Sequence, residues 1–262
     1  MRFPARHLLP SIPAALNRYQ APVAIPSGTA MGIPAPIVEQ LLREGEEHQC
    51  EGAPDNCVRV RALANLPTRF GDYQVVAFEN CLDKQDHAAF VHGDVFDREE
   101  VPVRVHSECL TGDAIGSLRC DCRDQLLESL ARIGQMERGV VLYLRQEGRG
   151  IGFVNKIRAY QLQDSGYDTV QANELLGFRP DERDYEIAAH MLSALHVRSI
   201  EILTNNPAKV QDLERHGVRI SGRIPVEIPA NDINRPYLQT KRDRMGHLLE
   251  IEQDDDLSAF SK

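Results

Sequence analysis

Half of the chain's six cysteines lie within fourteen residues, in the stretch CLTGDAIGSLRCDC that starts at Cys109. Cys109, Cys120 and Cys122 offer three thiolates, and zinc suits thiolates in a reduced compartment. Three protein ligands leave the fourth tetrahedral position open, as in catalytic zinc sites. The residues alone leave three alternatives: a disulfide with a leftover thiol, a closed site completed by His106, and three merely buried cysteines.

A zinc ion held by three thiolates would carry one net negative charge and would be a poorer Lewis acid than one held by histidines. Water at such a site therefore needs a neighbouring acid or base. Glu108, next to the first cysteine, or Tyr160 could serve.

Two other stretches are typical of anion sites at strand ends. RQEGRGIGFVNKIRAY, residues 145–160, leaves a strand, passes three glycines and enters a helix, where backbone amides can approach an anion. In LTNNPAK, Thr204 ends a strand and Lys209 lies in the first turn of the next helix. The first stretch alone could also be an ordinary turn with a solvated basic face. Together with a metal that activates water, the two predict binding along the carboxyl edge of a sheet and hydrolysis of a nucleotide.

The composition and net charge of the chain argue against a membrane protein, a secreted protein and a nucleic-acid-binding protein. The 262 residues are 42% apolar, and they contain neither a membrane-length apolar run nor a secretory signal, so we expect a cytoplasmic protein with reduced thiols and no membrane partner. The formal charge of −9 argues against a nucleic-acid partner.

The order of expected elements predicts an α/β fold. Residues 58–106 alternate short β-rich runs with turns, after a short helix at about 37–47. Helical and strand patterns then alternate, which predicts a mixed sheet with helices on both faces, preceded by a β-rich segment. We expect residues 1–60 to be an N-terminal extension, partly extended or disordered, because residues 1–38 hold seven of the fifteen prolines. Residues 249–262 form an acidic tail.

The motifs RVHSECLTGD, SLRCDC, RQEGRGIG, NKIRAY, DTV, DERD and LTNNPAK resemble, in this order, GTP cyclohydrolase II of riboflavin biosynthesis. The resemblance runs from about residue 66 to 248, and it implies a catalytic domain at 61–248. The preceding arm is too short for the dihydroxybutanone-phosphate synthase domain of bifunctional relatives, so we expect a monofunctional enzyme.

The resemblance implies one zinc ion per subunit, held by Cys109, Cys120 and Cys122, and a Mg²⁺ ion with the GTP triphosphate. It implies a homodimer, with Asp181 as proton acceptor and Arg183 as nucleophile. The products would be formate, pyrophosphate and 2,5-diamino-6-(5-phosphoribosylamino)pyrimidin-4(3H)-one. The implied GTP contacts are Arg104, Val105, His106, Ser107, Glu108, Gln125, Glu147, Gly148, Arg149, Thr169, Thr204 and Lys209.

Elementary chemistry supports some of these roles better than others. Glu147 and Gln125 could read the N–H groups of guanine. A guanidinium is a poor nucleophile, so Arg183 could attack phosphorus only if Asp181 takes its proton; otherwise it neutralises charge as pyrophosphate leaves.

Tyr160 bears on how far the reaction runs. Some relatives are thought to stop after ring opening and release a formylated pyrimidine, and the difference is associated with a tyrosine near the zinc. Because Tyr160 stands at that position in KIRAY, we expect formate release. The alternative is that Tyr160 has no role in the reaction and is a helix tyrosine with its ring in the core.

Two other classes stay open. A zinc nucleobase deaminase would carry P-C-x-x-C after H-x-E, and this chain has C-x-C without the proline. A non-catalytic zinc module would leave the arginine- and glycine-rich stretches unexplained.

Overall fold

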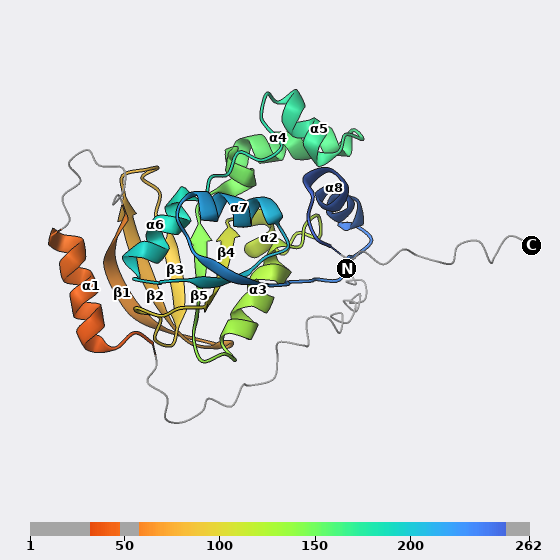
Figure 1. Cartoon of the computed structure of the whole chain (residues 1–262). Helices are drawn as coiled ribbons and strands as arrows, with labels where there is room; N and C mark the ends of the chain where they lie inside the picture. Colours follow the sequence, from red (N-terminus) through yellow and green to blue (C-terminus); the bar gives the residue numbers. More distant parts are fainter. Residues whose placement is uncertain (1–31, 48–57, 250–262) are drawn as a thin grey trace, which may run out of the picture.

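The computed structural model describes residues 32–47 and 58–249, and it has one seven-stranded sheet in the order β1-β2-β3-β5-β4-β6-β7 (Figure 1). The strands are β1 (Val58–Thr68), β2 (Gly71–Asn80), β3 (Ala88–His92), β4 (Val101–Ser107), β5 (Gly139–Leu144), β6 (Ile200–Leu203) and β7 (Ile220–Ile224). The helices are α1 (Ala35–Glu47), α2 (Leu110–Asp113), α3 (Cys122–Ile133), the 3₁₀ turn η3 (Glu147–Gly150), α4 (Gly152–Asp164), α5 (Thr169–Leu175), α6 (Glu186–Ala194), α7 (Pro207–Arg215) and α8 (Arg235–Met245).

The sheet joins an antiparallel half to a parallel half, which confirms the predicted mixed sheet. β1, β2, β3 and β5 pair antiparallel in turn, whereas β5, β4, β6 and β7 run parallel. β1 is an edge strand, so Pro67 can lie within it without removing a ladder hydrogen bond that the sheet needs.

Helices cover both faces of the sheet, also as predicted. On one face the core contains Val140, Leu142 and Leu144 of β5 together with side chains of α1, α6 and α7. On the other face Val141 packs with Ile133 and neighbouring side chains of α3. The alternation along β5 follows from the two-residue period of a strand.

The parallel half places four strand ends at one edge. β4, β5, β6 and β7 end at Ser107, Leu144, Leu203 and Ile224, and the glycine-rich turn, α3 and α7 follow three of them in the chain. Chain segments more than a hundred residues apart therefore meet there, as ligand-binding residues of parallel sheets do.

The predicted helix at 37–47 is α1, whose Leu41 is buried in the core against the sheet. The expected disorder of residues 1–31, the ten residues 48–57 and the acidic tail from 250 onward lie outside the described residues. Within the described ranges, no helix is long and apolar enough to cross a membrane.

Candidate active site

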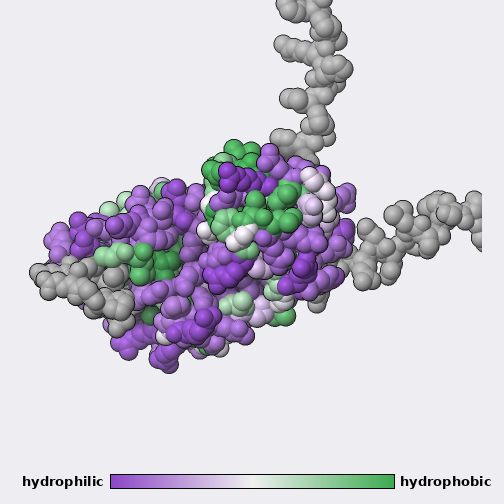
Figure 2. All heavy atoms as spheres, turned by 90° about the horizontal axis from the view of Figure 1, so that it is seen from above, coloured by the Kyte–Doolittle hydropathy of each residue, from purple (hydrophilic) through white to green (hydrophobic). Residues whose placement is uncertain are grey.

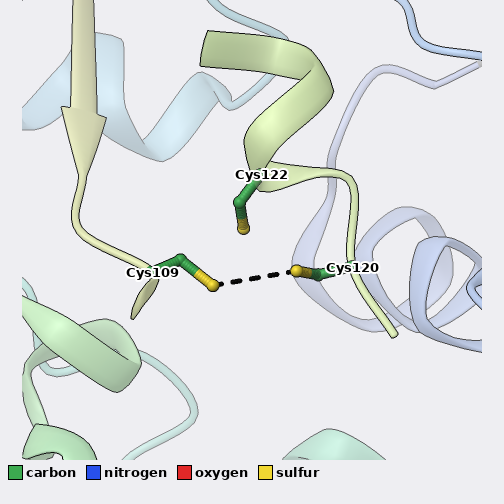
Figure 3. Close-up of side chains that lie close together, drawn as sticks. All are labelled: Cys109, Cys120 and Cys122. Carbon is green, nitrogen blue, oxygen red and sulfur yellow. Dashed lines mark hydrogen bonds between the residues drawn. The ribbon is translucent and has the colours of Figure 1, made fainter. Parts of the chain in front are cut away.

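The three predicted thiols converge at the carboxyl edge of the sheet (Figure 3). Cys109 follows β4, Cys122 begins α3, and Cys120 lies in the turn before it. The three Sγ atoms lie within 4.8 Å of one another, and the Sγ atoms of Cys109 and Cys120 are 3.7 Å apart. Strand β4 and helix α3 thus bring together the thiols of Cys109 and Cys122, which are thirteen residues apart in the chain.

The surroundings of the thiols fit a soft divalent cation such as zinc. A Cβ atom on Gly112 would lie 2.9 Å from the Sγ of Cys120 and 3.0 Å from that of Cys109, so only glycine leaves the cluster open. Hydrogen bonds from the other two thiols lower the pKa of Cys109, while donation to Cys109 raises the pKa of Cys122 and raises that of Cys120 to about 11. Ionisation of one thiol therefore makes ionisation of the other two less favourable. A bound cation would stabilise all three as thiolates.

Asp113 holds the cysteine loop in place. Its carboxylate accepts hydrogen bonds from the backbone N–H of Cys109 at 3.0 Å and the hydroxyl of Tyr143 at 2.9 Å, and it contacts Nε2 of His106 at 3.1 Å. His106 contacts Asp113 through Nε2 and does not belong to the group formed by the three thiols. Sequence reasoning missed Asp113 and Tyr143, which carry no motif-level signal beyond the aspartate of LTGD.

Lys156 links the thiols to the glycine-rich turn. Its Nζ lies 3.1 Å from the Sγ of Cys109 and 2.7 Å from Oε1 of Glu147, and its side chain is buried. The other oxygen of Glu147 accepts the backbone N–H of Leu110 at 2.7 Å. Glu147 therefore fastens the cysteine loop to η3, in addition to any contact that it makes with a ligand.

The glycine-rich turn has an unusual backbone. Gly148, Arg149, Gly150 and Gly152 have φ values of +64°, +61°, +92° and +80°, in the left-handed region that favours glycine. A Cβ atom on Gly150 would lie 3.1 Å from the backbone of Glu182. The run of left-handed residues lets the chain turn sharply from β5 into α4 and directs Arg149 toward the cavity.

Several buried polar atoms of the cavity wall have no hydrogen-bond partner among the described residues. They are Nε of Arg104, Nδ1 of His106, Oγ of Ser107 and Nη2 of Arg149, and all four residues line one cavity. Buried polar atoms normally have partners, so these atoms are typical of a site that receives a polar ligand.

The second predicted anion site lies at the same cavity. Lys209, in α7, is buried and donates from Nζ to the carbonyl oxygen of Val105 at 2.6 Å. Burial, and then the charges of Arg104 and Arg183, hold the pKa of Lys209 well below its ordinary value. Thr204 is buried at the end of β6, where its Oγ1 accepts the backbone N–H of Asn206.

Asp181 and Arg183 form a close ion pair. Nε of Arg183 donates to Oδ1 of Asp181 at 2.8 Å, and Nη2 donates to Oδ2. Burial opposes the charge of Arg183, but Tyr185 and Asp181 outweigh it and raise the pKa of the guanidinium. Burial also opposes the charge of Asp181, but the bonds from Arg183 outweigh it and lower the pKa of the carboxyl.

Tyr160 of α4 reaches the thiol group through one side chain. Its hydroxyl lies 3.3 Å from Oγ1 of Thr111, which lies 3.8 Å from the Sγ of Cys109. Burial raises the pKa of Tyr160, so its phenol stays protonated near neutral pH.

Comparison with known proteins gives the family. Residues 59–225 match the family model described as GTP cyclohydrolase II. GTP cyclohydrolase-2 of Picrophilus torridus is 55% identical over 186 residues, which cover 71% of this chain and 96% of that protein. The chain belongs to the GTP cyclohydrolase II family. Riboflavin biosynthesis protein RibBA of Chlorobium phaeovibrioides is 54% identical over 186 residues, covering 71% of this chain and 45% of that protein, so this chain spans about half the length of such relatives.

Among solved structures, the two-domain 3,4-dihydroxy-2-butanone 4-phosphate synthase RibBX from A. baumannii overlaps this chain with a TM-score of 0.37 at 15% identity. The overlap covers 72% of this chain and 44% of that structure, and a likeness this low carries no inference.

Within this GTP cyclohydrolase II fold, the cavity gathers nearly all of the predicted site residues. The lining residues include the three cysteines and Tyr160, Arg183, Arg104, His106, Ser107, Glu108, Gln125, Glu147, Gly148, Arg149, Thr169, Thr204 and Lys209. Val105 and Asp181 do not line it; the first presents its carbonyl to Lys209 and the second lies behind Arg183.

The cavity is cationic although the chain is acidic. Its lining arginines and lysines are Arg104, Arg119, Arg149, Lys156, Arg183, Lys209 and Lys241, against two carboxylates, Glu108 and Glu147. The formal charge of the whole chain is −9. A local excess of buried positive charge attracts a multiply charged anion.

Helix α8 adds residues to the candidate site that sequence reasoning did not single out. Tyr237, Lys241, Met245 and the following His247 all line the cavity. No short motif marks these residues, and the sequence RPYLQTKRDRM shows only a polar helix; that its Lys241 is buried appears only in the structure.

Proposed function

We propose that the chain catalyses the metal-dependent hydrolysis of GTP to 2,5-diamino-6-(5-phosphoribosylamino)pyrimidin-4(3H)-one, formate and pyrophosphate. The observation that carries the proposal is the position of three convergent thiols in the wall of a cationic cavity. The thiols suit zinc, and the cations suit a triphosphate. Membership of the GTP cyclohydrolase II family supports the substrate.

Cys109, Cys120 and Cys122 would hold one zinc ion, which would supply a Lewis acid to activate water against C8 of the base. The side chains nearby set the geometry. Asp113 orients the cysteine loop through the backbone of Cys109, and Lys156 offsets the negative charge of the thiolates.

At the phosphate end, we propose that Lys209, Thr204 and Arg149 bind the triphosphate, together with Mg²⁺, while Gln125 and Glu147 read the base. The ion pair of Asp181 and Arg183 favours an electrostatic role for Arg183. Its guanidinium is held in the charged form by Asp181, so a nucleophilic attack would first require an unfavourable proton transfer. Charge neutralisation as pyrophosphate leaves needs no such step.

We also propose a homodimer whose contact includes the exposed apolar side chains of α4. Seen from above, apolar side chains gather on the side of the molecule that carries α4 and α5 (Figure 2). They include Phe153, Val154 and Ile157 of α4 and Leu175 of α5. Exposed apolar patches of this kind commonly mark protein interfaces. Light scattering of Val154→Lys should show a shift from dimer to monomer, and a monomeric unaltered chain would contradict the proposal.

The activity is tested by adding GTP to the zinc-loaded protein and measuring formate, pyrophosphate and ammonia. Formate and pyrophosphate in equal amounts, without ammonia, are expected. Ammonia would indicate a deaminase, and a formylated pyrimidine without formate would indicate a ring-opening enzyme that stops early. The metal-free protein should still release pyrophosphate but leave the imidazole ring intact.

A further inference from the structure

Tyrosine rings contact most of the positive charges in the cavity wall. Six of the seven arginines and lysines that line the cavity lie over a tyrosine ring, and each ring takes one arginine and one lysine. The pairs are Arg119 and Lys156 over Tyr160, Arg183 and Lys209 over Tyr185, and Arg149 and Lys241 over Tyr237. A cation within about 6 Å of a ring centroid is attracted by the negative face of the ring.

Two of these six cations have no carboxylate partner among the described residues. The four that pair with an acidic residue are Arg119, Lys156, Arg183 and Lys241. Lys209 donates instead to the carbonyl oxygen of Val105, and Arg149 contacts the sulfur of Met245. A carboxylate offsets the charge of a cation, whereas a carbonyl, a thioether or a ring carries no net charge. An anion in the cavity would supply the missing countercharge.

Tyr185 lies behind the cavity wall and joins the two segments that carry its cations. It is 4% exposed and does not line the cavity. Its backbone N–H donates to Oδ2 of Asp212 in α7 at 2.9 Å, and Lys209 belongs to the same helix. Arg183 precedes Tyr185 by two residues. The ring centroid lies 5.1 Å from Nζ of Lys209 and 5.8 Å from Cζ of Arg183, so one buried residue contacts both cations.

The Tyr185 ring opposes the repulsion between these two cations. Burial, and then the charges of Arg104 and Arg183, lower the pKa of Lys209. The negative face of the ring favours the charged lysine and attracts both cations. The Tyr185 hydroxyl is buried without a hydrogen-bond partner among the described residues. The ring, and not the hydroxyl, therefore makes the contacts that matter here.

We propose that Tyr185 is a positioning residue whose ring face holds Lys209 and Arg183 at the cavity wall for a chain of condensed phosphates. This role deepens the proposed function and rests on it, because it assigns both cations to the triphosphate. Inorganic tripolyphosphate has a similar chain of charged phosphates without the base, so it probes the two cations apart from catalysis.

The test compares Tyr185→Leu with Tyr185→Phe in the zinc-loaded, full-length chain. The first removes the ring and keeps an apolar side chain, and the second keeps the ring and removes only the unpartnered hydroxyl. Phe70→Leu is the matched control, because Phe70 is also buried, has Arg69 at 5.1 Å from its ring centroid, and does not line the cavity. Calorimetry with Mg²⁺ present measures the affinity for inorganic tripolyphosphate and for guanosine, and kcat and KM are measured with GTP.

Tyr185→Leu should weaken tripolyphosphate binding by about tenfold and raise KM for GTP by a similar factor, while guanosine binding stays unchanged. Tyr185→Phe and Phe70→Leu should bind tripolyphosphate as tightly as the unaltered chain. Equal affinity of Tyr185→Leu and the unaltered chain for tripolyphosphate would overturn the proposal. Equal weakening of tripolyphosphate and guanosine binding would also overturn it, because Tyr185 would then be merely structural.

A second series covers the case in which Tyr185→Leu does not fold. Phenylalanine, difluorophenylalanine and pentafluorophenylalanine at position 185 have nearly the same shape, and each step withdraws more electron density from the ring face. Tripolyphosphate affinity should fall along the series, and a constant affinity would contradict attraction by the ring. If the unaltered chain releases no formate from GTP, the proposed function fails, while the tripolyphosphate titrations still test the role of Tyr185.

Discussion

At the scale of single residues, the sequence was most informative where side chains carry chemistry. The spacing of Cys109, Cys120 and Cys122 predicted the thiol cluster, because few other residue types can hold a metal in this way. The supporting residues could not be predicted in the same way. Asp113 and Lys156 act through contacts between segments that only the fold brings together, and an aspartate or lysine in a sequence does not reveal its partner.

The space over Gly112 gives a first prediction. Gly112→Ala would place a Cβ atom about 3 Å from two Sγ atoms, so the thiols would have to move apart. We expect zinc affinity to fall by about tenfold or more while the fold persists, since neither hydrophobic core cluster includes Gly112 or the three cysteines. Metal analysis and circular dichroism measure the two effects. Gly222→Ala is the control, because Gly222 has no positive φ and an added Cβ there would meet only the end of the flexible Glu201 side chain, at 3.2 Å. Unchanged zinc content in Gly112→Ala would contradict the assignment of the thiols as ligands.

A second prediction concerns Tyr160. Tyr160→Phe removes the hydroxyl that contacts Thr111 beside the cysteine site but keeps the ring, so the loss should be confined to proton donation. We expect pyrophosphate release to continue while formate release falls by about a hundredfold and a formylated pyrimidine accumulates. Product analysis by chromatography distinguishes the species. Tyr167→Phe, at an exposed tyrosine, should behave as the unaltered chain. Equal yields of formate and pyrophosphate from Tyr160→Phe would show that the phenol is not needed.

At the scale of helices and strands, periodicity predicted the elements whose apolar faces meet the sheet. The β-rich run over residues 58–106 and the alternation of helical and strand patterns after it were expected and are confirmed. The expectations did not include α2, α5, α8 or β7. α8 has the sequence RPYLQTKRDRM, with a polar composition, and its inner face carries Lys241, which periodicity of apolar residues cannot detect. β7 has the sequence ISGRI, and none of its residues is buried, because it is an edge strand.

The contact between α1 and β1 gives a third prediction. Gly45 lies so close to β1 that an added Cβ would be 2.2 Å from the carbonyl oxygen of Val60. Gly45→Ala should therefore push α1 away from the sheet and lower the free energy of unfolding by about 1–3 kcal/mol. This loss exceeds the gain of about 1 kcal/mol that the higher helix propensity of alanine would give. Glu46→Ala, at an exposed position of the same helix, should be neutral or stabilising. Urea unfolding and hydrogen exchange of the α1 amides measure both. If the α1 amides of Gly45→Ala exchange as slowly as those of the unaltered chain, the close packing of α1 on β1 is contradicted.

At the scale of the whole molecule, an acidic chain folds around a cationic cavity. The sequence predicted two anion sites, at the glycine-rich turn and at LTNNPAK, and the parallel strands bring both to one edge. The sequence did not predict how strongly the positive charges that line the cavity shift one another's pKa values. Burial, and then cations led by Lys241 and Arg149, lower the pKa of His247 to about 3, and similar causes lower the pKa of Lys209.

This mutual repulsion predicts that binding of a triphosphate takes up protons. The bound phosphates would raise the pKa of Lys209 and His247 above their values in the free protein, so the complex holds more protons than the free chain. Affinity for a nucleotide triphosphate should then weaken as the pH rises through the range in which these groups titrate. Calorimetry in two buffers of different ionisation enthalpy measures the uptake, and Lys209→Met should reduce it. Net release of protons would contradict the prediction.

The closeness of the thiols also has a consequence for handling the protein. The Sγ atoms of Cys109 and Cys120 are 3.7 Å apart, and a covalent bond between them needs about 2 Å, so a small rotation of two side chains is enough for an oxidant to join them. An ion held by the thiolates would block that reaction by engaging their lone pairs. A preparation stripped of metal in air should therefore lose thiol titre and resist reloading until a reductant is added, whereas the loaded protein should withstand the same exposure.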